Sequence, residues 1–357
     1  MIAQAMHLPH LNELQDRFAV TALAEPSATV RDALCARFGI AAGFPDWPEM
    51  LLDTELDAVL IASPAATHAE VVVAALESGL HVFCEKPLAI TLADIDRIAA
   101  ARDRAGRVVQ VGYMKRHDPA FRRALEEMPE SAERLRYVNI VVNDPEWVPY
   151  FLPGDIVRAA DVPGEVVDAT RRAESEQVEE AVGRGDAEAC FAFSEGYLGS
   201  LVHHVNIVNG FLEKMGEPLP ARVVDAAWWN GGRSIAGYCE LANGSRWDSA
   251  WIQLLDTREY RESIQLFFDT SLRSLTFPSP WLRMSPTVYE RQDADAFANA
   301  VSRFRSFEES FRRELIHFHD CCVNGVECLT PPEQARLDTE LLTKMFVSAE
   351  RSRISVT

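Results

Sequence analysis

Short apolar runs alternate with amphipathic segments through the first third of the chain. Continuous apolar runs at 18–24, 57–63 and 108–111 predict buried strands. The segments between them have helical spacing and end signals: Ser27 can cap one helix, which stops at Gly39. Apolar strands that alternate with capped helices predict a Rossmann-like α/β fold, a doubly wound parallel sheet covered on both faces.

The sequence opens on a helix rather than on a strand. Apolar side chains recur at helical spacing in residues 1–16, before the first strand. A doubly wound domain normally begins with a strand and a G-x-G-x-x-G/A turn, and we expect this sheet to lack that first strand. Two explanations stay open. The favoured one is that Met1 is an internal methionine of a product longer by ~25 residues or fewer. The other is a divergent protein that no longer binds dinucleotide in the usual way.

The pattern changes after the first third. Residues 135–143 read as a strand, and a polar, acidic segment follows at about 144–188. Charge-rich runs are usually solvated helices, although a lid or a dimer arm would read the same way. Strand-like runs with Asn-Gly turns between 221 and 290 predict a large, mostly antiparallel sheet. We therefore predict two domains, 1–120 and 121–357, with the last helices of the second packing back.

Composition narrows the function classes. The net charge of −19 argues against nucleic acid as a partner, because such binding needs a basic surface. No apolar run approaches the ~20 residues of a membrane helix, and no signal peptide opens the chain. The seven cysteines are scattered without zinc-ligand spacing. We expect reduced thiols, a cytoplasmic location, no membrane partner and no metal.

One block carries the strongest functional signal. Glu85-Lys86-Pro87 follows an apolar strand, so the lysine stands at the carboxyl end of that strand, where open α/β sheets bind ligands. The surrounding stretch DAVLIASPAATHAEVVVAALESGLHVFCEKPLAIT (57–91) resembles the Gfo/Idh/MocA family of oxidoreductases. Residues 111–121 and 311–346 resemble later blocks of the same family, so the resemblance covers nearly the whole chain.

The resemblance implies a Rossmann domain followed by an α/β domain with a large open sheet. It also implies a nicotinamide cofactor, hydride transfer at a secondary hydroxyl of a sugar or polyol, and Lys86 as the acid/base. Partial burial depresses the pKa of an ammonium group, so such a lysine can exchange a proton near neutral pH. The alternative is a surface ion pair between Lys86 and Glu85.

The family's second catalytic element is a helix with Asp, then His four residues later, then Asp three after that. Gly199, His203 and Asn206 match these positions, which would share one helical face. His203 is then a proton donor or substrate ligand, with its usual acidic partner missing at 199. The alternative for His203 is a satisfied core histidine, and for His204 that alternative is favoured.

The resemblance also assigns binding residues. Glu25 ends the second family strand, where an acidic residue binds ribose hydroxyls and favours NAD over NADP, although a solvated carboxylate would look the same. The cofactor-binding residues are predicted to be Ala3, Glu25, Ser63, Pro64, His68, Glu85 and Lys86. The substrate-binding residues are predicted to be Tyr113, Arg116, His117 and Asn206; an exposed loop would explain Arg116 and His117 equally well.

Several functions remain open. The leading hypothesis is an NAD-dependent dehydrogenase or reductase of a small-molecule sugar, cyclitol or polyol. An epimerase, lyase or glycosidase could use the same cofactor transiently, and a non-catalytic ligand sensor is the alternative outside enzymes. Relatives pair through the aromatic-rich sheet, so a homodimer or homotetramer is expected.

Overall fold

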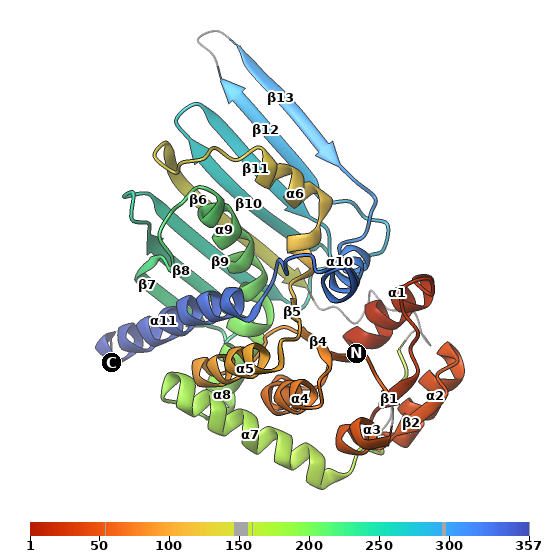
Figure 1. Ribbon diagram of the computed structural model, residues 1–357. Coiled ribbons are helices and arrows are strands. Elements are labelled where there is room, and N and C mark those ends of the chain that lie inside the picture. Colours follow the sequence, from red (N-terminus) through yellow and green to blue (C-terminus); the bar gives the residue numbers. More distant parts are fainter. Residues whose placement is uncertain (54, 146–155, 159, 295–297, 357) are drawn as a thin grey trace. The chain divides into compact units, whose positions relative to one another are not determined.

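The computed structural model describes residues 1–53, 55–145, 156–158, 160–294 and 298–356 (Figure 1). They divide into two compact units that are each discontinuous in sequence. The first unit contains Met1–Gly112, Phe151–Gln177 and Phe311–Glu333, and the second contains Tyr113–Tyr150, Val178–Ser310 and Gln334–Thr357. The predicted boundary between two domains near residue 120 stays a prediction. The first segment of the first compact unit ends at Gly112, and two later segments of the chain also belong to that unit.

The first unit carries the predicted parallel strands. They are β1 (Ala22–Ala24), β2 (Ala42–Phe44), β3 (Ala58–Ile61), β4 (His81–Glu85) and β5 (Val109–Gly112). Its helical segments are η1 (Ala3–His7), α1 (Leu8–Glu13), α2 (Ala28–Phe38), α3 (Trp47–Asp53), α4 (Ala65–Glu77), α5 (Leu92–Ala105) and α10 (Ser310–Asn324). The Rossmann-like fold class is confirmed.

The parallel strands of the first unit form two separate sheets. β1 pairs with β2, and β3, β4 and β5 form a second sheet in that order. The described residues show no pairing between β1 and β3. The chain begins instead with η1, a π-helical turn, and α1, whose Leu11 and Leu14 pack against Phe83 of β4.

Local signals explain the helix ends of this unit. The Ser27 hydroxyl accepts a hydrogen bond from the amide of Val30 at the start of α2, which stops at Gly39 with a φ of 68°. Thr91 caps α5 in the same way. The long acidic helix α7 (Gly164–Val182) is mostly exposed, as predicted, and its Gln177 amide donates to the carbonyl of Ala66.

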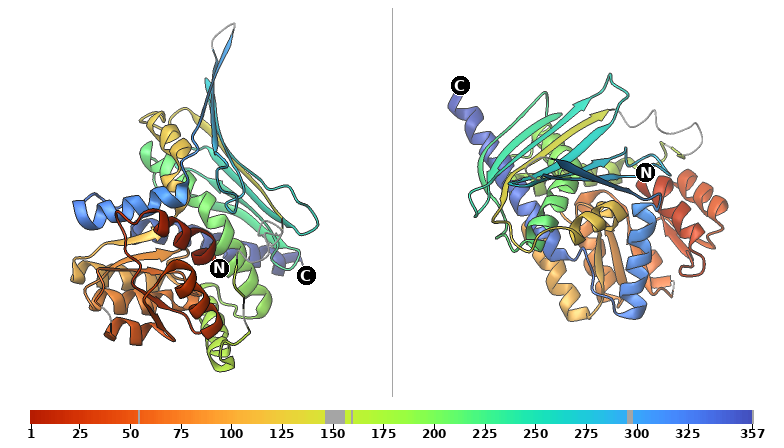
Figure 2. Two further views of the ribbon diagram at one scale, coloured as in Figure 1. Left: turned by 90° about the vertical axis from the view of Figure 1, so that its right-hand side faces the viewer. Right: turned by 90° about the horizontal axis from the view of Figure 1, so that it is seen from above.

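The second unit is built on one large sheet, as predicted (Figure 2). Its strands are β6 (Leu135–Pro145), β7 (Arg222–Trp229), β8 (Ser234–Glu240), β9 (Arg246–Leu254), β10 (Arg261–Phe268), β11 (Ser271–Phe277), β12 (Val288–Ala294) and β13 (Asn299–Arg305). Their order is β13-β12-β11-β10-β6-β9-β8-β7. All neighbours are antiparallel except β6 and β9, which run parallel. The sheet extends beyond the predicted limit of residue 290 through β12 and β13.

Helices cover one face of this sheet. They are η2 (Met114–His117), α6 (Pro119–Glu126), α8 (Ala187–Cys190), η4 (Phe191–Leu201), α9 (Val202–Lys214) and α11 (Pro332–Val356). Successive side chains of a strand point to opposite faces of the sheet. Accordingly, Trp228, Trp247 and Trp251 are buried, whereas Trp229 and Tyr238 are exposed. None of the described helices is both long and apolar enough to cross a membrane.

Candidate active site

The Glu85-Lys86-Pro87 block lies at the carboxyl edge of the three-stranded sheet. Cys84 is in register with Ile61 of β3, and Glu85 with Gly112 of β5. Parallel pairing therefore places the block beside the Ser63-Pro64 turn that follows β3. Lys86 is half-buried, and its backbone amide donates to a carboxylate oxygen of Glu85 over 3.1 Å. The predicted position of the block is confirmed, and the acid/base role of Lys86 stays a prediction.

His68 holds this edge together. Its Nδ1 lies 2.8 Å from the carbonyl oxygen of Pro87, and its Nε2 lies 2.9 Å from that of Ser63. The side chain is only 1% exposed, and burial lowers its pKa more than the two carbonyls raise it. The lowered pKa favours the neutral ring, which has one N–H and donates to one of these two carbonyl oxygens. His68 is predicted to bind the cofactor; its ring positions the Lys86 turn against the turn after β3.

Pro64 and the hydroxyl of Ser63 flank the same edge. Pro64 is the N-cap residue of α4, and the Ser63 hydroxyl lies 2.7 Å from that of Thr67 in the first helical turn. The Ser63 side chain is exposed enough to meet a ligand, whereas that of His68 is not. Their predicted cofactor contacts stay predictions.

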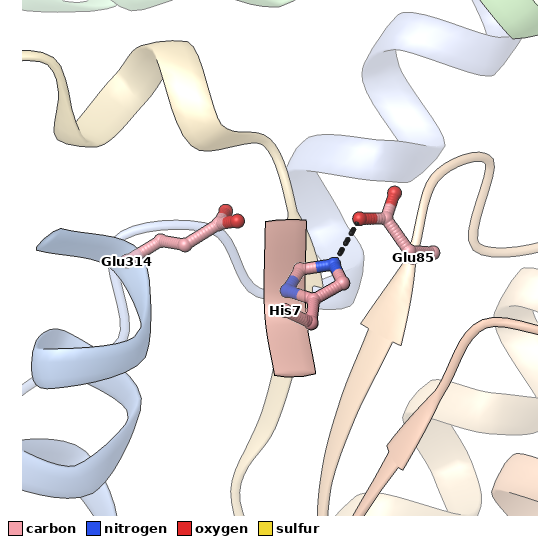
Figure 3. A group of neighbouring side chains, drawn as sticks. All are labelled: His7, Glu85 and Glu314. Atoms are coloured by element: carbon pink, nitrogen blue, oxygen red, sulfur yellow. Dashed lines mark hydrogen bonds and ion pairs between the residues drawn. The ribbon is translucent and has the colours of Figure 1, made fainter. Parts of the chain in front are cut away.

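Glu85 has a partner that the sequence did not reveal. One of its carboxylate oxygens lies 2.6 Å from Nε2 of His7, which ends the π-helical turn η1 (Figure 3). Burial opposes ionisation of Glu85, but the hydrogen bond and charge of His7, together with Lys86, outweigh burial and lower its pKa. Glu85 is therefore a carboxylate directly before the candidate catalytic lysine.

Gly112 makes room for this carboxylate. A Cβ built there would lie 3.2 Å from Cα and Cδ of Glu85, closer than ordinary contact. We expect Gly112→Ala to push the buried Glu85 away from His7 and to lower the free energy of unfolding by about 1–3 kcal/mol. Urea unfolding followed by circular dichroism measures this, with Glu70→Ala, at an exposed position of α4, as the control. Equal stability of the two variants would contradict the tight packing.

The first unit also carries Glu25, which has an unexpected acidic neighbour. Glu25 follows β1, and its carboxylate accepts a hydrogen bond from the amide of Ser27. Asp161 accepts from the Ser27 hydroxyl over 2.5 Å and from the amide and hydroxyl of Thr29 over 3.0 and 2.9 Å. These hydrogen bonds, above all that from Ser27, lower the pKa of Asp161 to about 2. Two carboxylates thus share Ser27 at the amino terminus of α2.

The helical turn that contains Ala3 is held by a later segment as well. The side-chain amide of Gln4 donates to the carbonyl of Val157 and accepts from its backbone amide, over 3.2 and 2.8 Å. Val157 also packs beside the apolar cluster of α1 and α2. Ala3 itself is half-buried, and its predicted cofactor contact stays a prediction.

In the second unit, three residues predicted to bind substrate gather around Asp338. Asn206 and Asn209 donate to its two carboxylate oxygens, each over 2.7 Å. Burial raises the pKa of Asp338 to about 7, against hydrogen bonds from these amides and from Tyr113 and the charge of Arg116. Arg116 donates to the carbonyl of Asn206 and is 6% exposed.

These contacts change the expected environment of the substrate residues. Tyr113, Arg116 and His117 are buried, so the alternative of an exposed loop is wrong. Arg116 also lies over the ring of Phe121, at 5.6 Å from its centroid. The polar contacts of Arg116 and Asn206 that the structure shows go to protein groups, and their substrate roles stay predictions.

The predicted single helical face of 199, 203 and 206 needs correction. Gly199 lies in the π-helix η4, and regular α-helix begins only at Val202. A Cβ at 199 would lie 2.9 Å from the carbonyl oxygen of Ser194, one π-turn earlier. The wider turn therefore leaves no room for an aspartate at 199. His203 is half-buried on α9, and its catalytic role stays a prediction.

The neighbouring His204 lies in a charged cluster that sequence reasoning missed. Glu262 of β10 is completely buried and bonds to Nζ of Lys115 through both oxygens, at 2.5 and 2.6 Å. Nε2 of His204 lies 3.1 Å from the same carboxylate, and the Tyr260 hydroxyl also donates to it. Burial opposes ionisation of Glu262, but Lys115 and His204 outweigh it and lower its pKa to about 2.

Comparisons with known proteins agree with this architecture. Residues 1–113 match the model described as the oxidoreductase family with an NAD-binding Rossmann fold, GFO_IDH_MocA. Solved structures share the fold of both units. The oxidoreductase domain protein from Kribbella flavida has a TM-score of 0.73 at 16% identity, covering 98% of this chain and 95% of that one. The 3-ketoreductase KijD10 from Actinomadura kijaniata has a TM-score of 0.70 at 18% identity, covering 97% and 94%.

Several sequence relatives are inositol dehydrogenases by name. Myo-inositol 2-dehydrogenase of Thermotoga maritima is 29% identical over 196 residues, 50% of this chain and 59% of that protein. Inositol 2-dehydrogenase of Salmonella typhimurium is 35% identical over 117 residues, 32% of this chain and 35% of that protein. The chain thus matches less than two thirds of either relative. Residues 1–113 thus match the Gfo/Idh/MocA family model, and the solved structures share the two-unit fold of the described residues.

Proposed function

We propose that this protein is an NAD-dependent oxidoreductase acting on a secondary hydroxyl or ketone of a cyclitol, sugar or related polyol. The supporting observation is Lys86 at the carboxyl edge of β4, fixed by His68 beside the turn after β3. Because two of the relatives are named inositol 2-dehydrogenases, a cyclitol is the first substrate to test.

The residues of the first unit fit the two ends of a nicotinamide dinucleotide. Ser63, Pro64 and Glu85 would border the nicotinamide half, and Glu25 would meet the adenosine ribose. Glu25 and Asp161 both hydrogen-bond to Ser27, and two carboxylates there would repel the 2′-phosphate of NADP. The glycine turn that receives the pyrophosphate is absent from the printed sequence, so the fit is partial.

The chemistry assigned to this chain is proton transfer. A bound nicotinamide would supply the hydride chemistry. Lys86 would take the proton from the substrate hydroxyl during oxidation and return it to the carbonyl oxygen during reduction. His68 would keep the lysine turn in place without titrating, because burial lowers its pKa. His203 stays the proposed proton donor or substrate ligand of the second unit.

A cofactor titration and a substrate panel test this proposal. The purified chain, and a form extended upstream in the same reading frame, are titrated with NADH and NADPH by fluorescence and then assayed with myo-inositol and other polyols. We expect NADH to bind at least ten times more tightly than NADPH, and NAD-linked oxidation of at least one cyclitol. Absence of binding by both forms would refute the proposed function.

A second candidate is a ligand-binding relative without cofactor. Two contacts favour it: Gln4, at the start of η1, bonds to Val157, and Ser27, at the start of α2, bonds to Asp161. In both places a later segment of the chain already binds polar groups at the start of a helix. Binding of a cyclitol without any binding of NADH in the same titrations would support this candidate.

We also propose a cytoplasmic homodimer or homotetramer. Val141, Trp229 and Tyr238 are exposed on the large sheet, 45%, 46% and 37% respectively, and exposed apolar side chains on one sheet favour association. The described cysteines are all free of disulfides, as a reducing compartment would leave them.

A further inference from the structure

Three buried ligand-type side chains converge in the first unit. His7 ends η1, Glu85 ends β4 and Glu314 lies in the second turn of α10. One nitrogen of the histidine and one oxygen of each carboxylate lie within 4.8 Å of one another. Figure 3 shows the Glu314 carboxylate pointing toward His7, on the side away from Glu85. The residues are 0%, 6% and 0% exposed.

The polar atoms of this cluster are incompletely paired. His7 Nε2 bonds to Glu85, and the other Glu85 oxygen accepts from the backbone amide of Lys86. Neither oxygen of Glu314 nor Nδ1 of His7 has a hydrogen-bond partner in the described part of the chain. Buried polar atoms are nearly always satisfied, so the three unpaired atoms of His7 and Glu314, in residues whose ligand atoms lie within 4.8 Å of one another, indicate a bound group.

The apolar surroundings and the charges of the cluster also favour a bound cation. The rings of Phe83 and Phe311 approach His7 edge-on, at 5.3 and 5.8 Å, and give the space apolar walls. Burial and then the negative charge of Glu85 raise the pKa of Glu314 well above its ordinary value. A protonated Glu314 would be neutral, but its hydroxyl would still lack an acceptor.

We propose that His7, Glu85 and Glu314 bind a divalent first-row transition-metal ion such as Zn²⁺. An imidazole nitrogen and two carboxylate oxygens are ligands that Zn²⁺ accepts, and their two negative charges balance the ion. The ligands bind the ion in their deprotonated forms, so entry of the ion is accompanied by proton release. The ligand atoms need to approach by about an ångström to reach Zn²⁺ distances of ~2 Å.

A metal ion at this site would stabilise the turn that contains Lys86. Glu85 is a ligand and Lys86 is the next residue, so the ion would fix the turn to η1 and α10. η1 is a π-helical turn, a feature that often marks functional positions. The inference is independent of the proposed hydride transfer, because it rests on ligand geometry alone.

Direct metal measurements test the site. The protein, with any histidine tag removed, is freed of metal with a chelator and titrated with ZnCl₂ by calorimetry at pH 7.5 in two buffers of different ionisation enthalpy. We expect one Zn²⁺ per chain with proton release. Glu314→Gln, which keeps the shape but removes the anionic ligand, should weaken binding by at least about 100-fold, since even indirect partners of a metal contribute 10- to 100-fold.

The control is Glu70→Gln, the same change at an exposed position of α4, which should bind as the wild type does. If Glu314→Gln fails to fold, as judged by circular dichroism, His7→Gln removes a ligand from another element and must give the same loss. Wild-type protein that takes up no Zn²⁺, or that binds it no better than the ligand variant, would overturn the proposal and leave Glu314 a buried neutral acid.

Discussion

Replacing Lys86 by alanine is expected to lower kcat by about 10²- to 10⁴-fold, the range that a positioned acid/base group contributes. The lysine stands at the carboxyl edge of β4, where it would exchange the proton of the substrate hydroxyl. The measurement is steady-state NADH formation with the best substrate of the panel, in the form of the chain that binds NADH. KM for the substrate should change less than kcat, because the lost interaction is made in the transition state.

Lys214→Ala is the matched control for this experiment. It removes an exposed lysine at the end of α9 and should leave kcat unchanged. The Lys86 variant must also keep the far-ultraviolet circular dichroism spectrum and the NADH affinity of the wild type within about threefold. A folded, NADH-binding Lys86→Ala variant with wild-type kcat would remove Lys86 from the mechanism.

Patterns local in sequence predicted the first unit well. The apolar runs became parallel strands because only a sheet covered on both faces buries continuous apolar segments. Glu85-Lys86-Pro87 lies at a strand end because the strand before it ends there. The same reasoning placed the start of α2 at Ser27, since its hydroxyl caps the helix.

Residues that meet across long separations could not be predicted in this way. His7 and Glu85 are 78 positions apart, and only the docking of η1 against β4 brings them together. The prediction that His203, rather than His204, is the catalytic histidine depended on helical spacing counted from Gly199, and therefore on where α9 begins. The π-helix η4 changes the residues per turn before it, so spacing counted as regular α-helix misplaces position 199.

The charged cluster of the second unit was missed for the same physical reason. Lys115 and Glu262 are 147 positions apart, and a lone glutamate in a strand normally faces solvent. Its burial follows from the register of β10 with β6, which places Glu262 opposite Val142 on the face covered by helices. Register is a tertiary property, so strand propensity does not reveal it.

Lys115→Met is expected to lower the free energy of unfolding by about 3–5 kcal/mol, the cost of leaving one charge of a buried pair without its partner. Glu262 is fully buried, and His204, 3.1 Å away, would be its remaining basic neighbour. Urea unfolding at pH 7 measures the loss. Lys344→Met is the control: its pair with Glu340 has a similar separation of 2.6 Å but is partly exposed, so its loss should stay below about 1 kcal/mol.

The pH dependence of this loss has a definite sign. The folded protein lowers the pKa of Glu262 from 4.5 to about 2, so the stabilisation by the pair is complete above pH 4.5 and disappears as the pH falls toward 2. The difference between wild type and Lys115→Met should therefore narrow in that range. A difference that is constant from pH 7 to pH 3 would show that packing of the lysine stem, rather than the ion pair, causes the loss.

The double variant Lys115→Met, Glu262→Leu separates these causes further. With the buried carboxylate gone, the methionine faces an apolar side chain of comparable size, and most of the single-variant loss should be recovered. His204 would then be left without the carboxylate now 3.1 Å away. If the double variant is less stable than Lys115→Met alone, the carboxylate must stabilise the fold through His204 and Tyr260 even without the lysine.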